Sequence, residues 1–425
     1  MKALPLCLAV LLVAATVGAG AMVPAESNEV GTTVDPSPAT PLQVSTNGDR
    51  TTEASNTTPR NILSLQGSTI DRSSLRRHHV DIGPAAGFET AAATDRLTTG
   101  AIEQNLSAET VDDEQLAASV NAAEATTERL RGREADAINA FAAGNREPRV
   151  VLEELALIGQ TADRLRDRID VIDARIDTSD DADGSRRELS DRLTAIDYEL
   201  RMLDGPVRTY AADVFSGAQP AGRVSIQAGS GNFELSAINN GDYLRESYRF
   251  DNRASGGEIT AATAEKIAAE QYPWFWERRS GGTWSIGGPG SLSLVSIDID
   301  DGSLQTFIDG TTEQRFVEHQ RISLGEVVPV TRTTKRQDGL VVTVSRTYVG
   351  GPVDVRVVDA DTGQPVAAAV SLGQNGQESV SVGSTNNDGT AWIVTPRGTF
   401  TLTILAEDDS AAFVELSPAD AGSVL

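Results

Sequence analysis

Residues able to act as nucleophiles or metal ligands are few in this chain. It contains three histidines, His78, His79 and His319, and a single cysteine, Cys7. Neighbouring side chains of a strand point to opposite faces, so His78 and His79 have poor geometry for binding one metal ion, and we expect both at the surface. A Ser-His-Asp triad would depend on His319, but no G-x-S-x-G motif accompanies it. The sequence thus predicts no catalytic residue, no metal site and no other cofactor.

Acidic residues are abundant, so pairs of carboxylates occur by chance and do not by themselves identify a site. One cluster, Asp181, Asp183 and Gly184, has part of the pattern of a calcium-binding loop. If an EF-hand loop is aligned on Gly184, its first position is Ser179 and the position of its bidentate glutamate is Ser190. Both residues are unsuitable ligands there. We therefore interpret the cluster as a solvated acidic loop between two helices.

Aromatic residues gather in one short segment. Residues 272–276 read Y-P-W-F-W, and together with Trp284 they account for three of the four tryptophans. Exposed aromatic clusters bind sugars or proteins, whereas buried ones fill the core of a small domain. We expect this cluster to be core, because the surrounding sequence has the pattern of a small domain with one helix and several strands.

The charge balance indicates the solvent in which the protein works. Only three of the 36 basic residues are lysines, and the 61 acidic residues give a formal net charge of −25. Repulsion of this size opposes folding in dilute salt and is relieved by screening, so we predict adaptation to high salt. A GC-rich genome would explain the arginines but not the acidic excess. The same charge repels phosphates, which argues against binding nucleic acid or anionic membrane surfaces.

The N-terminal residues have the pattern of an export signal. Lys2 precedes an apolar run over residues 4–17, and an A-x-A pattern ends at Ala21. We predict cleavage after Ala21, which makes residues 1–21 a signal peptide and places the mature protein outside the cell or at its surface. The alternative is an uncleaved anchor, because residues 3–23 are nearly long enough to span a bilayer. That anchor would be the protein's membrane attachment.

Two segments follow the signal before the first predicted helix. Residues 22–60 are rich in Thr, Ser and Pro and are predicted to be a disordered tether. Residues 61–107 are predicted to be a partly ordered segment. Within it, residues 62–65 form a short apolar stretch that we expect to be a strand or a docking segment with an unknown partner. Asn56 and Asn105 each begin an N-x-S/T sequon, so both are candidate glycosylation sites on an exported chain.

Residues 108–216 show the spacing of a helical coiled-coil region. Apolar residues recur at alternating intervals of four and three, which is the a/d pattern of helices that pack along a seam. They form two stripes, Val151, Leu155, Ile158, Ala162, Leu165, Ile169, Ile172 and Ile176, then Leu189, Leu193, Ile196, Leu200 and Leu203. With a less regular helix over residues 109–143 and short turns, we predict an antiparallel coiled-coil hairpin or bundle. The alternative is a seam between two chains.

The remaining sequence has the pattern of strands. In residues 222–322, three predicted strands, a helix over residues 259–272 and a later hairpin indicate an α+β module. Residues 323–338 are predicted to be a connector. Short runs separated by Gly, Asn and Asp turns indicate an all-β sandwich over residues 339–418. The predicted fold class is therefore multidomain α+β, with an antiparallel helical coiled-coil region first, then the α+β module, then the sandwich.

The last domain carries motifs of a known sandwich family. Residues 359–366 read D-A-D-T-G-Q-P-V, residues 385–389 read T-N-N-D-G, and residues 398–402 read G-T-F-T-L. They resemble the D-x-x-T-G-x-P-V, T-x-x-D-G and G-x-Y-x-L motifs of the carboxypeptidase regulatory-like, transthyretin-like sandwich, with Phe400 in place of the usual tyrosine. The resemblance implies a non-catalytic spacer or binding module of an exported protein.

Two broader resemblances concern the earlier regions. Residues 259–322, with F-I-D-G-T-T at residues 307–312, are similar to PepSY-like modules, which are linked to binding or inhibition in exported proteins. The whole chain resembles haloarchaeal exported proteins of unknown function. The residues that carry this resemblance are R-E-A-D-A-I at 133–138, L-E-E-L-A at 152–156, the Y-P-W-F-W run and residues 304–310. This class implies export and adaptation to brine but no activity.

These patterns together favour a protein that is not an enzyme. We hypothesise a salt-adapted, secreted or cell-surface protein with a structural, adhesive or partner-binding role toward an unknown protein or envelope partner. The alternative is a PepSY-like regulator or inhibitor of an exported hydrolase. A hydrolase of unknown type is the third hypothesis, since chance pairs of carboxylates supply the residues that such an enzyme needs.

Overall fold

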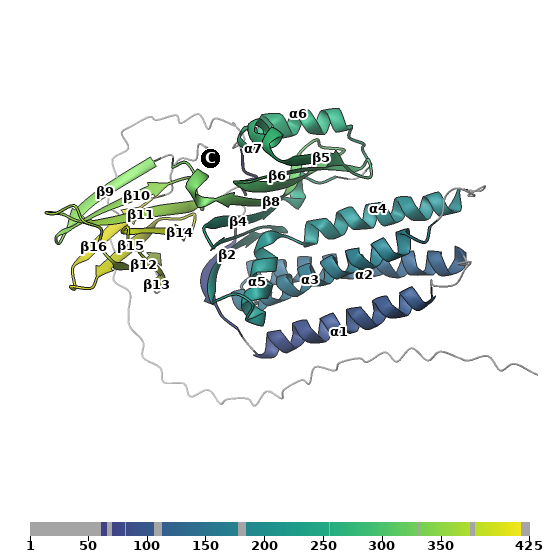
Figure 1. Cartoon of the computed structure of the whole chain (residues 1–425), viewed down its shortest axis with the longest axis horizontal. Helices are drawn as coiled ribbons and strands as arrows, with labels where there is room; N and C mark the ends of the chain where they lie inside the picture. Colours follow the sequence, from purple (N-terminus) through teal and green to yellow (C-terminus); the bar gives the residue numbers. More distant parts are fainter. Residues whose placement is uncertain are drawn as a thin grey trace, which may run out of the picture. The chain divides into compact units, whose positions relative to one another are not determined.

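The computed structural model of the chain describes residues 61–65, 70–80, 82–105, 113–176, 184–254, 256–329, 331–374 and 379–417 (Figure 1). All of them belong to one compact unit, Thr57–Leu425. The predicted signal peptide and tether, with Ala21 and Asn56, lie outside the described residues, as do Asp181, Asp183 and the side chain of Asn105.

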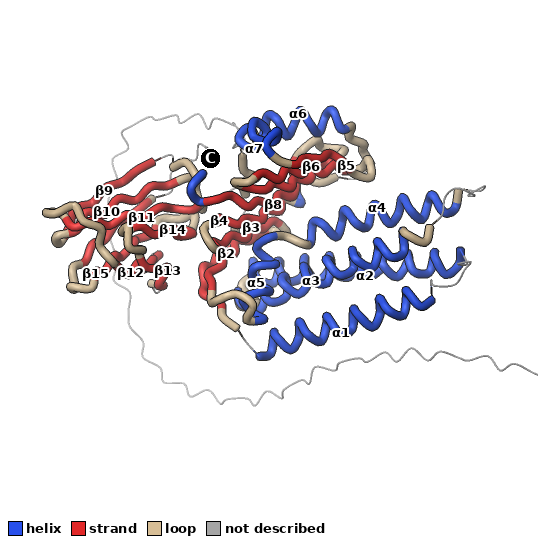
Figure 2. Tube along the Cα trace, in the orientation of Figure 1, coloured by secondary structure: helices blue, strands red, loops and turns tan. Residues whose placement is uncertain are grey.

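Helices dominate the chain before residue 217. They are α1 (Ile82–Asn105), α2 (Asp113–Ala142), α3 (Pro148–Asp173), α4 (Ser185–Leu203) and α5 (Pro206–Ser216). Both α3 and α5 begin with proline, whose fixed φ suits the first helical turn and whose missing N–H costs no hydrogen bond there. In Figure 2, α2, α3 and α4 run side by side as blue tubes, in agreement with their mutual contacts.

The predicted apolar stripes form the core of this helical bundle. The stripe residues from Ile158 to Ile172 in α3 and from Leu189 onward in α4 are buried in one cluster together with Leu116, Val120 and Leu130 of α2. The stripes therefore pack against each other within one chain, in agreement with the prediction of an intramolecular hairpin or bundle. Coiled-coil packing in the strict sense, with interlocking side chains, stays a prediction.

Helix α1 occupies residues for which the sequence predicted only partial order. Its sequence is rich in Ala, Thr and Gly and lacks a stripe of large apolar residues, so periodicity did not reveal it. Phe88 and Ala92 are its buried residues, and the Phe88 ring stacks on Phe215 of α5 with centroids 6.5 Å apart. Asp95 of this helix also pairs with Arg164 and Arg168 of α3, so α1 is positioned by packing on both α3 and α5 rather than by a seam of its own.

An eight-stranded antiparallel sheet follows, with strand order β1-β2-β3-β4-β8-β7-β6-β5. The strands are β1 (Arg72–His78), β2 (Gly222–Gly229), β3 (Asn232–Asn239), β4 (Asp242–Tyr248), β5 (Thr283–Gly287), β6 (Leu292–Ile299), β7 (Gly302–Asp309) and β8 (Arg315–Ser323). Asn240 and Gly241, both with positive φ, form the turn between β3 and β4. Between β4 and β5 the chain forms α6 (Ala261–Gln271) and α7 (Pro273–Arg278).

Both faces of this sheet are covered. On one face Phe233, Leu235 and Leu244 share a core with α3 and α5. On the other face Tyr243 shares a core with residues of α6 and α7 and with Ile62. A strand with both faces covered cannot send its polar residues to water, so the central strands of this sheet bury charged side chains as well as apolar ones.

The C-terminal residues form two four-stranded sheets with one shared core. Their strand orders are β14-β11-β10-β9 and β13-β12-β15-β16. The strands are β9 (Thr331–Gln337), β10 (Leu340–Arg346), β11 (Pro352–Asp359), β12 (Ala368–Gln374), β13 (Val380–Ser384), β14 (Thr390–Val394), β15 (Phe400–Ala406) and β16 (Ala411–Leu416). This is the predicted all-β sandwich. It begins with β9, which lies within the predicted connector and pairs with β10.

Candidate functional site: two buried arginine networks and a docked segment

The guanidinium of Arg208 lies between the helical bundle and the sheet and is 0% exposed. Its Nη2 donates to Glu134 Oε1 of α2 at 2.5 Å, and its Nε donates to Glu246 Oε2 of β4 at 3.0 Å. Its Nη1 donates to the Leu203 carbonyl at 3.1 Å. Burial alone would lower the pKa of this guanidinium, but Tyr248 and the two glutamates raise it, so it stays charged. Arg208 thus joins α2, α5 and the sheet.

Glu246 also determines where α5 begins. Its Oε1 accepts the backbone N–H groups of Val207 at 2.7 Å and Arg208 at 2.8 Å, so the carboxylate occupies the positive end of the helix. Gly205 precedes this turn. A Cβ at Gly205 would lie 2.1 Å from the carboxyl carbon of Glu246, so glycine is required where the carboxylate approaches the chain.

Tyr248 and His319 extend this network along the sheet. The Tyr248 hydroxyl lies 2.9 Å from Glu246 Oε2, 3.0 Å from the Met202 carbonyl and 2.9 Å from His319 Nε2. The carboxylate and the carbonyl only accept, and the hydroxyl has one proton, so His319 Nε2 donates to the hydroxyl oxygen. Burial lowers the pKa of His319 to about 4, so its ring is neutral near pH 7. We call Glu134, Arg208, Glu246, Tyr248 and His319 the Arg208 network.

A cavity of about 830 Å³ opens beside this network, between α2 and the sheet. Glu134 lines it, and burial raises the pKa of this carboxyl against the opposing effect of Arg208. Near its rim, Arg131 pairs with Glu199 at 3.2 Å, and Arg253 pairs with the same carboxylate. These charges are therefore already paired within the chain, and the remaining walls include the apolar side chains of Ile138, Phe233 and Phe250.

On the opposite face of the sheet, Arg245 is also 0% exposed and lies between two glutamates. Its Nη2 donates to Glu234 Oε2 at 2.6 Å, and its Nη1 donates to Glu318 Oε1. The Tyr272 hydroxyl donates to the other oxygen of Glu318 at 2.7 Å. Burial raises the pKa of Glu318 while Arg245 opposes it, and the pKa of Arg245 is raised by its two glutamates against the effect of burial. We call these four residues the Arg245 network.

The Arg245 network and its neighbours hold residues 61–65, which we call the docked segment. Its backbone carbonyls accept hydrogen bonds from buried side chains of the sheet and from one side chain of the sandwich. The bonds are Gln320 Nε2 to Asn61 O at 2.6 Å, Arg315 Nη1 to Ile62 O at 3.1 Å, Arg245 Nη2 and Ser247 Oγ to Leu63 O at 2.7 and 2.6 Å, and Arg397 Nη1 to Leu65 O at 3.0 Å. The segment is therefore held mainly through its main chain.

Asn61 fixes the start of the docked segment against α7. Its Oδ1 accepts the backbone N–H of Trp274 at 3.0 Å, and its own N–H donates to the Gln271 carbonyl at 2.6 Å. Its φ is 62°, in the left-handed region that asparagine tolerates better than most residues. The first residue of the segment thus caps α7 and directs the chain toward the Arg245 network.

Two side chains of the sandwich, Arg397 and Tyr348, contact the sheet close to the docked segment. Arg397, in the loop before β15, donates to Glu234 Oε2 at 3.1 Å as well as to the docked segment. The Tyr348 hydroxyl donates to the Tyr243 hydroxyl of β4 at 2.9 Å. Burial raises the pKa of Tyr243 to about 12, so both hydroxyls stay protonated over the ordinary pH range. The docked segment therefore contacts the sheet, α7 and the sandwich together.

The histidines differ from the sequence prediction. His78 is buried at the end of β1, with its ring edge-on to Phe215 at a centroid distance of 5.6 Å, so the expectation of a surface position was wrong. It was wrong because β1 pairs with β2 and covers α5, which the local sequence does not reveal. Burial lowers the pKa of His78 to about 4. His79 is exposed, and His319 lies in the Arg208 network rather than near a serine nucleophile.

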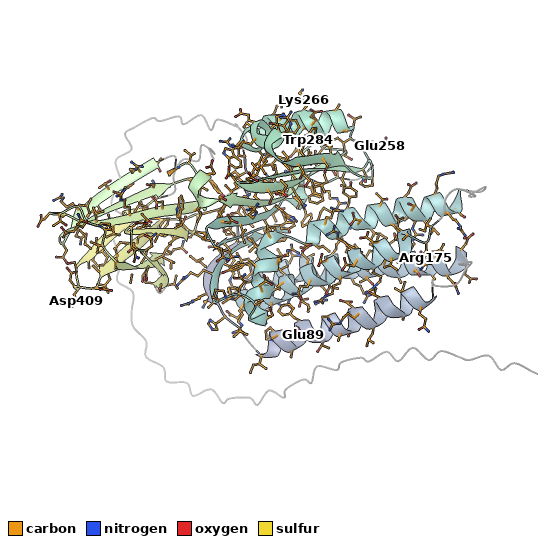
Figure 3. The ribbon with its side chains drawn as sticks, viewed as in Figure 1. Glu89, Arg175, Glu258, Lys266, Trp284 and Asp409 are labelled. Carbon is orange, nitrogen blue, oxygen red and sulfur yellow. The ribbon has the colours of Figure 1, made fainter. Side chains whose placement is uncertain are left out.

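The aromatic cluster divides between core and surface. Tyr272, Trp274 and Phe275 are buried in the core under α6 and α7, as predicted. Trp284 on β5, labelled in Figure 3, is 45% exposed. The Arg279 guanidinium lies 3.9 Å from the Trp276 ring centroid and 5.5 Å from that of Trp284, so the exposed end of the cluster is covered in part by a cation.

The charged residues of the two networks were not predicted from the sequence. Their one local signal is a charge in the middle of an otherwise apolar strand, as in L-R-E-S-Y at residues 244–248 and F-V-E-H-Q-R-I at residues 316–322. In a chain with so many acidic residues, this signal does not separate a buried glutamate from a solvated one. The partners Arg208 and Glu134 lie far from these strands in sequence, so their contacts required the tertiary structure.

Among the described residues, no group of three or more His, Cys, Asp or Glu side chains could hold a metal ion. The same part of the chain has no helix that combines the length and the apolar character needed to cross a bilayer. Asn56, Ala21 and the side chain of Asn105, which the sequence predicted as glycosylation and cleavage sites, lie outside the described residues.

Comparison with protein families adds three matches. Residues 1–220 match a domain of unknown function (DUF7096), residues 224–328 match a family of unknown function (DUF7094), and residues 331–413 match an archaeal fibronectin-III type-like domain. Fold and matches together define an archaeal multidomain protein with helices first and a β-sandwich last. Because the first match spans more than half of the 425 residues, the chain belongs to the DUF7096 family.

The other comparisons found nothing similar, since no curated protein and no solved structure matches the chain. The match over residues 331–413 names a different family from the carboxypeptidase regulatory-like one that the motifs resembled, although both are β-sandwiches. The PepSY-like resemblance of the α+β region stays a prediction, because the match there is to a family of unknown function.

Proposed function

We propose that the protein is an exported, salt-adapted protein of the cell surface or the surrounding medium, with a structural, adhesive or partner-binding role. The observation that supports this proposal is the use of its buried charges. Arg208 and Arg245 are each bound to two glutamates, and each joins regions that are distant in sequence. Buried charges that connect parts of the fold are expected in a protein that binds or positions a partner rather than in one that converts a substrate.

The C-terminal domain supports the same role. A fibronectin-III-like sandwich is a stable, two-layered module whose strands bury one face and leave the loops and the other face free for contacts. The acidic composition favours a place in concentrated salt, where counterions screen the repulsion between carboxylates. The apolar run before Ala21 favours export.

Cell fractionation in near-saturating salt tests the location. The chain should be expressed with its own N-terminus in a salt-loving archaeal host, and the N-terminal peptide of the recovered protein should be determined by mass spectrometry. We expect the protein in the envelope or the medium, beginning after Ala21. A soluble cytoplasmic pool with an intact N-terminus would contradict export, and an envelope-bound form that retains residues 1–21 would favour the uncleaved anchor.

Crosslinking at native salt, followed by affinity purification, tests the role. A structural or adhesive protein should crosslink to envelope components or to other copies of itself. Co-purification of an exported hydrolase whose activity rises when residues 222–322 are deleted would instead favour the regulatory alternative. Hydrolytic turnover by the purified chain, lost on replacing one carboxylate, would contradict the proposal that the protein is not an enzyme.

The salt dependence of stability is a separate test. The midpoint of thermal unfolding should rise steadily between 0.2 and 3 M KCl. Over this range the Debye length falls from about 7 Å to well below 3 Å, so repulsion between carboxylates is progressively screened. Equal stability at both ends of this range would show that the acidic surface is not an adaptation to salt. This result would leave the proposed location untouched.

A further inference from the structure

We propose that the groove formed by the Arg245 network, α7 and Arg397 is a peptide-binding site, which in this chain is occupied by its own residues 61–65. The ligand class is an extended peptide with a polar first residue and apolar residues at its second, third and fifth positions. The inference goes beyond the proposed function, because it concerns a binding activity of the folded unit wherever the protein is located.

The docked segment is held differently from a strand or a helix. Segments that belong to a sheet or a helix bond mainly to other backbone groups. Here the carbonyls of residues 61, 62, 63 and 65 accept from side chains, and the one backbone–backbone bond described for the segment is from Asn61 to Gln271. Donors that read main-chain carbonyls recognise an extended backbone, which is the common element of peptide ligands.

Every side chain of the docked segment except that of Ser64 is buried. Ile62 is buried among Tyr243, Tyr272 and Trp274, and Leu63 and Leu65 are buried as well. Ser64, between the two leucines, is only half-buried. The groove therefore selects three apolar side chains and tolerates variation at the fourth position.

Three of the five side chains that donate to the docked segment are also held by residues outside it. Arg245 is held by Glu234 and Glu318, and Arg397 is held by Glu234. The guanidinium of Arg315 lies 4.9 Å from the Tyr272 ring centroid. A site whose donors are already oriented binds an incoming peptide at a smaller entropic cost than one that must be assembled around it.

A full-length variant whose own segment is expelled tests the proposal. In Ile62→Asp/Leu63→Asp/Leu65→Asp, three carboxylates replace the buried apolar side chains, and burying unpaired charge is strongly unfavourable. The probe is a fluorescent peptide with the wild-type sequence of residues 59–66, titrated in high salt and followed by fluorescence anisotropy. We expect the variant to bind this peptide. The wild-type chain should bind about 100-fold more weakly, since its own segment competes at an effective concentration on the order of millimolar.

Two matched controls establish specificity. Adding Ser247→Ala to the variant removes one donor to Leu63 O and should weaken peptide binding by about 3- to 10-fold, the value of one hydrogen bond. The full-length variant Leu97→Asp/Leu405→Asp/Phe413→Asp changes three exposed apolar residues and should bind the peptide as weakly as the wild type. A peptide of residues 59–66 that carries the three aspartates should bind neither the wild-type chain nor the Ile62→Asp/Leu63→Asp/Leu65→Asp variant.

The test remains decisive if the variant does not fold alone. In that case the wild-type peptide should restore a cooperative thermal transition whose midpoint rises with peptide concentration, because a ligand of the native state stabilises it by mass action. A variant that neither binds the peptide nor is refolded by it would overturn the proposal, and residues 61–65 would then be ordinary core. Equal binding of the peptide by the wild type and the variant would overturn it too.

Discussion

The two faces of the eight-stranded sheet each bury an arginine between two glutamates, but they use it differently. The Arg208 network joins side chains of α2, α5 and β4 and caps the first turn of α5. The Arg245 network holds the main chain of residues 61–65 and, through Glu234, the sandwich residue Arg397. Similar buried ion pairs therefore connect secondary-structure elements on one face of the sheet, whereas on the other face they bind the backbone of a separate segment.

The largest expected effect comes from removing either arginine. Arg208→Met removes the arginine partner of Glu134 and Glu246, and Arg245→Met removes that of Glu318 and leaves Glu234 with Arg397 alone. Because a buried charge then lacks its partner, each change should lower the free energy of unfolding by about 3–5 kcal/mol. Urea unfolding at one fixed, high salt concentration measures it. Arg131→Met is the matched control, because Arg131 is 46% exposed at its side chain and its pair with Glu199 is worth less than about 1 kcal/mol.

The same two variants sharpen the comparison between the faces. Amide hydrogen exchange should increase at residues 61–65 in Arg245→Met, since the donor to Leu63 O is lost. In Arg208→Met the increase should instead appear at the backbone amides of residues 207 and 208 in the first turn of α5. The Glu246 carboxylate that accepts these amides loses its arginine partner in this variant. Identical exchange patterns would show that the two networks form one cooperative unit.

The pH dependence of the Arg208 network is the next effect in size. Burial lowers the pKa of His319 from its ordinary value of 6.5 to about 4, so between these pH values the unfolded chain binds a proton that the folded chain does not. Stability contributed by neutral His319 is complete above pH 6.5 and falls as the pH is lowered toward 4, by up to about 3 kcal/mol.

His319→Gln isolates this contribution, because glutamine keeps a polar side chain but does not titrate. The free energy of unfolding should fall less in the variant than in the wild type between pH 6.5 and pH 4. His78, with its pKa also lowered to about 4, acts in the same direction in both proteins, and Asp204, with its pKa raised to about 6, acts in the opposite direction in both. Parallel curves for the two proteins would contradict the buried, neutral state of His319.

A glycine substitution tests the cap of α5 with a smaller expected effect. Gly205→Ala places a Cβ against the Glu246 carboxylate and should cost about 1–3 kcal/mol through displacement of that group. Gly132→Ala, in α2, is the matched control. A Cβ there meets no atom within 4 Å, so the change should stabilise the protein by about 0.5–1 kcal/mol through helix propensity. Thermal unfolding of both variants gives the comparison, and a neutral Gly205→Ala would show that the carboxylate has room to move.

The smallest expected effect concerns the link between the sheet and the sandwich. Tyr348→Phe removes the hydrogen bond to the Tyr243 hydroxyl and should cost about 0.5–1.5 kcal/mol. If the docked segment and Arg397 supply most of the other contacts between the sheet and the sandwich, Tyr348→Phe and Ser247→Ala act independently. The decreases in the free energy of unfolding caused by the two substitutions should then add without coupling. A strong coupling between the two substitutions, measured as a double-mutant cycle, would mean that the segment and the tyrosine pair act as one contact.

Much of the element order was predictable, because it depends on local patterns. The stripe through Ile158, Leu165 and Ile172 predicted a long helix, and short runs between Gly, Asn and Asp turns predicted the final strands. Helix α1 and strand β1 were not predicted. One is Ala- and Thr-rich without an apolar face, and the other, R-S-S-L-R-R-H, is a polar edge strand that forms only by pairing with β2.

The candidate site was predictable only as one apolar stretch. Residues 62–65 stood out as a segment that needed a partner, but nothing near them in sequence indicated what that partner was. Its donors Arg245, Arg315 and Arg397 come from positions separated by up to 332 residues from the carbonyls that they bind. Local sequence carries no information about such pairs, whereas folding the sheet brings them together.

By itself, the sequence determined the acidic surface, the succession of helices and strands, and the presence of a final sandwich, because charge and periodicity are properties of neighbouring residues. Only the tertiary structure decided that Arg208 and Arg245 are buried and that His78 is not at the surface. It also decided that residues 61–65 lie in a groove. The physical reason is that the burial of a charged or apolar side chain depends on which faces are covered, and both faces of this sheet are covered by elements distant in the chain.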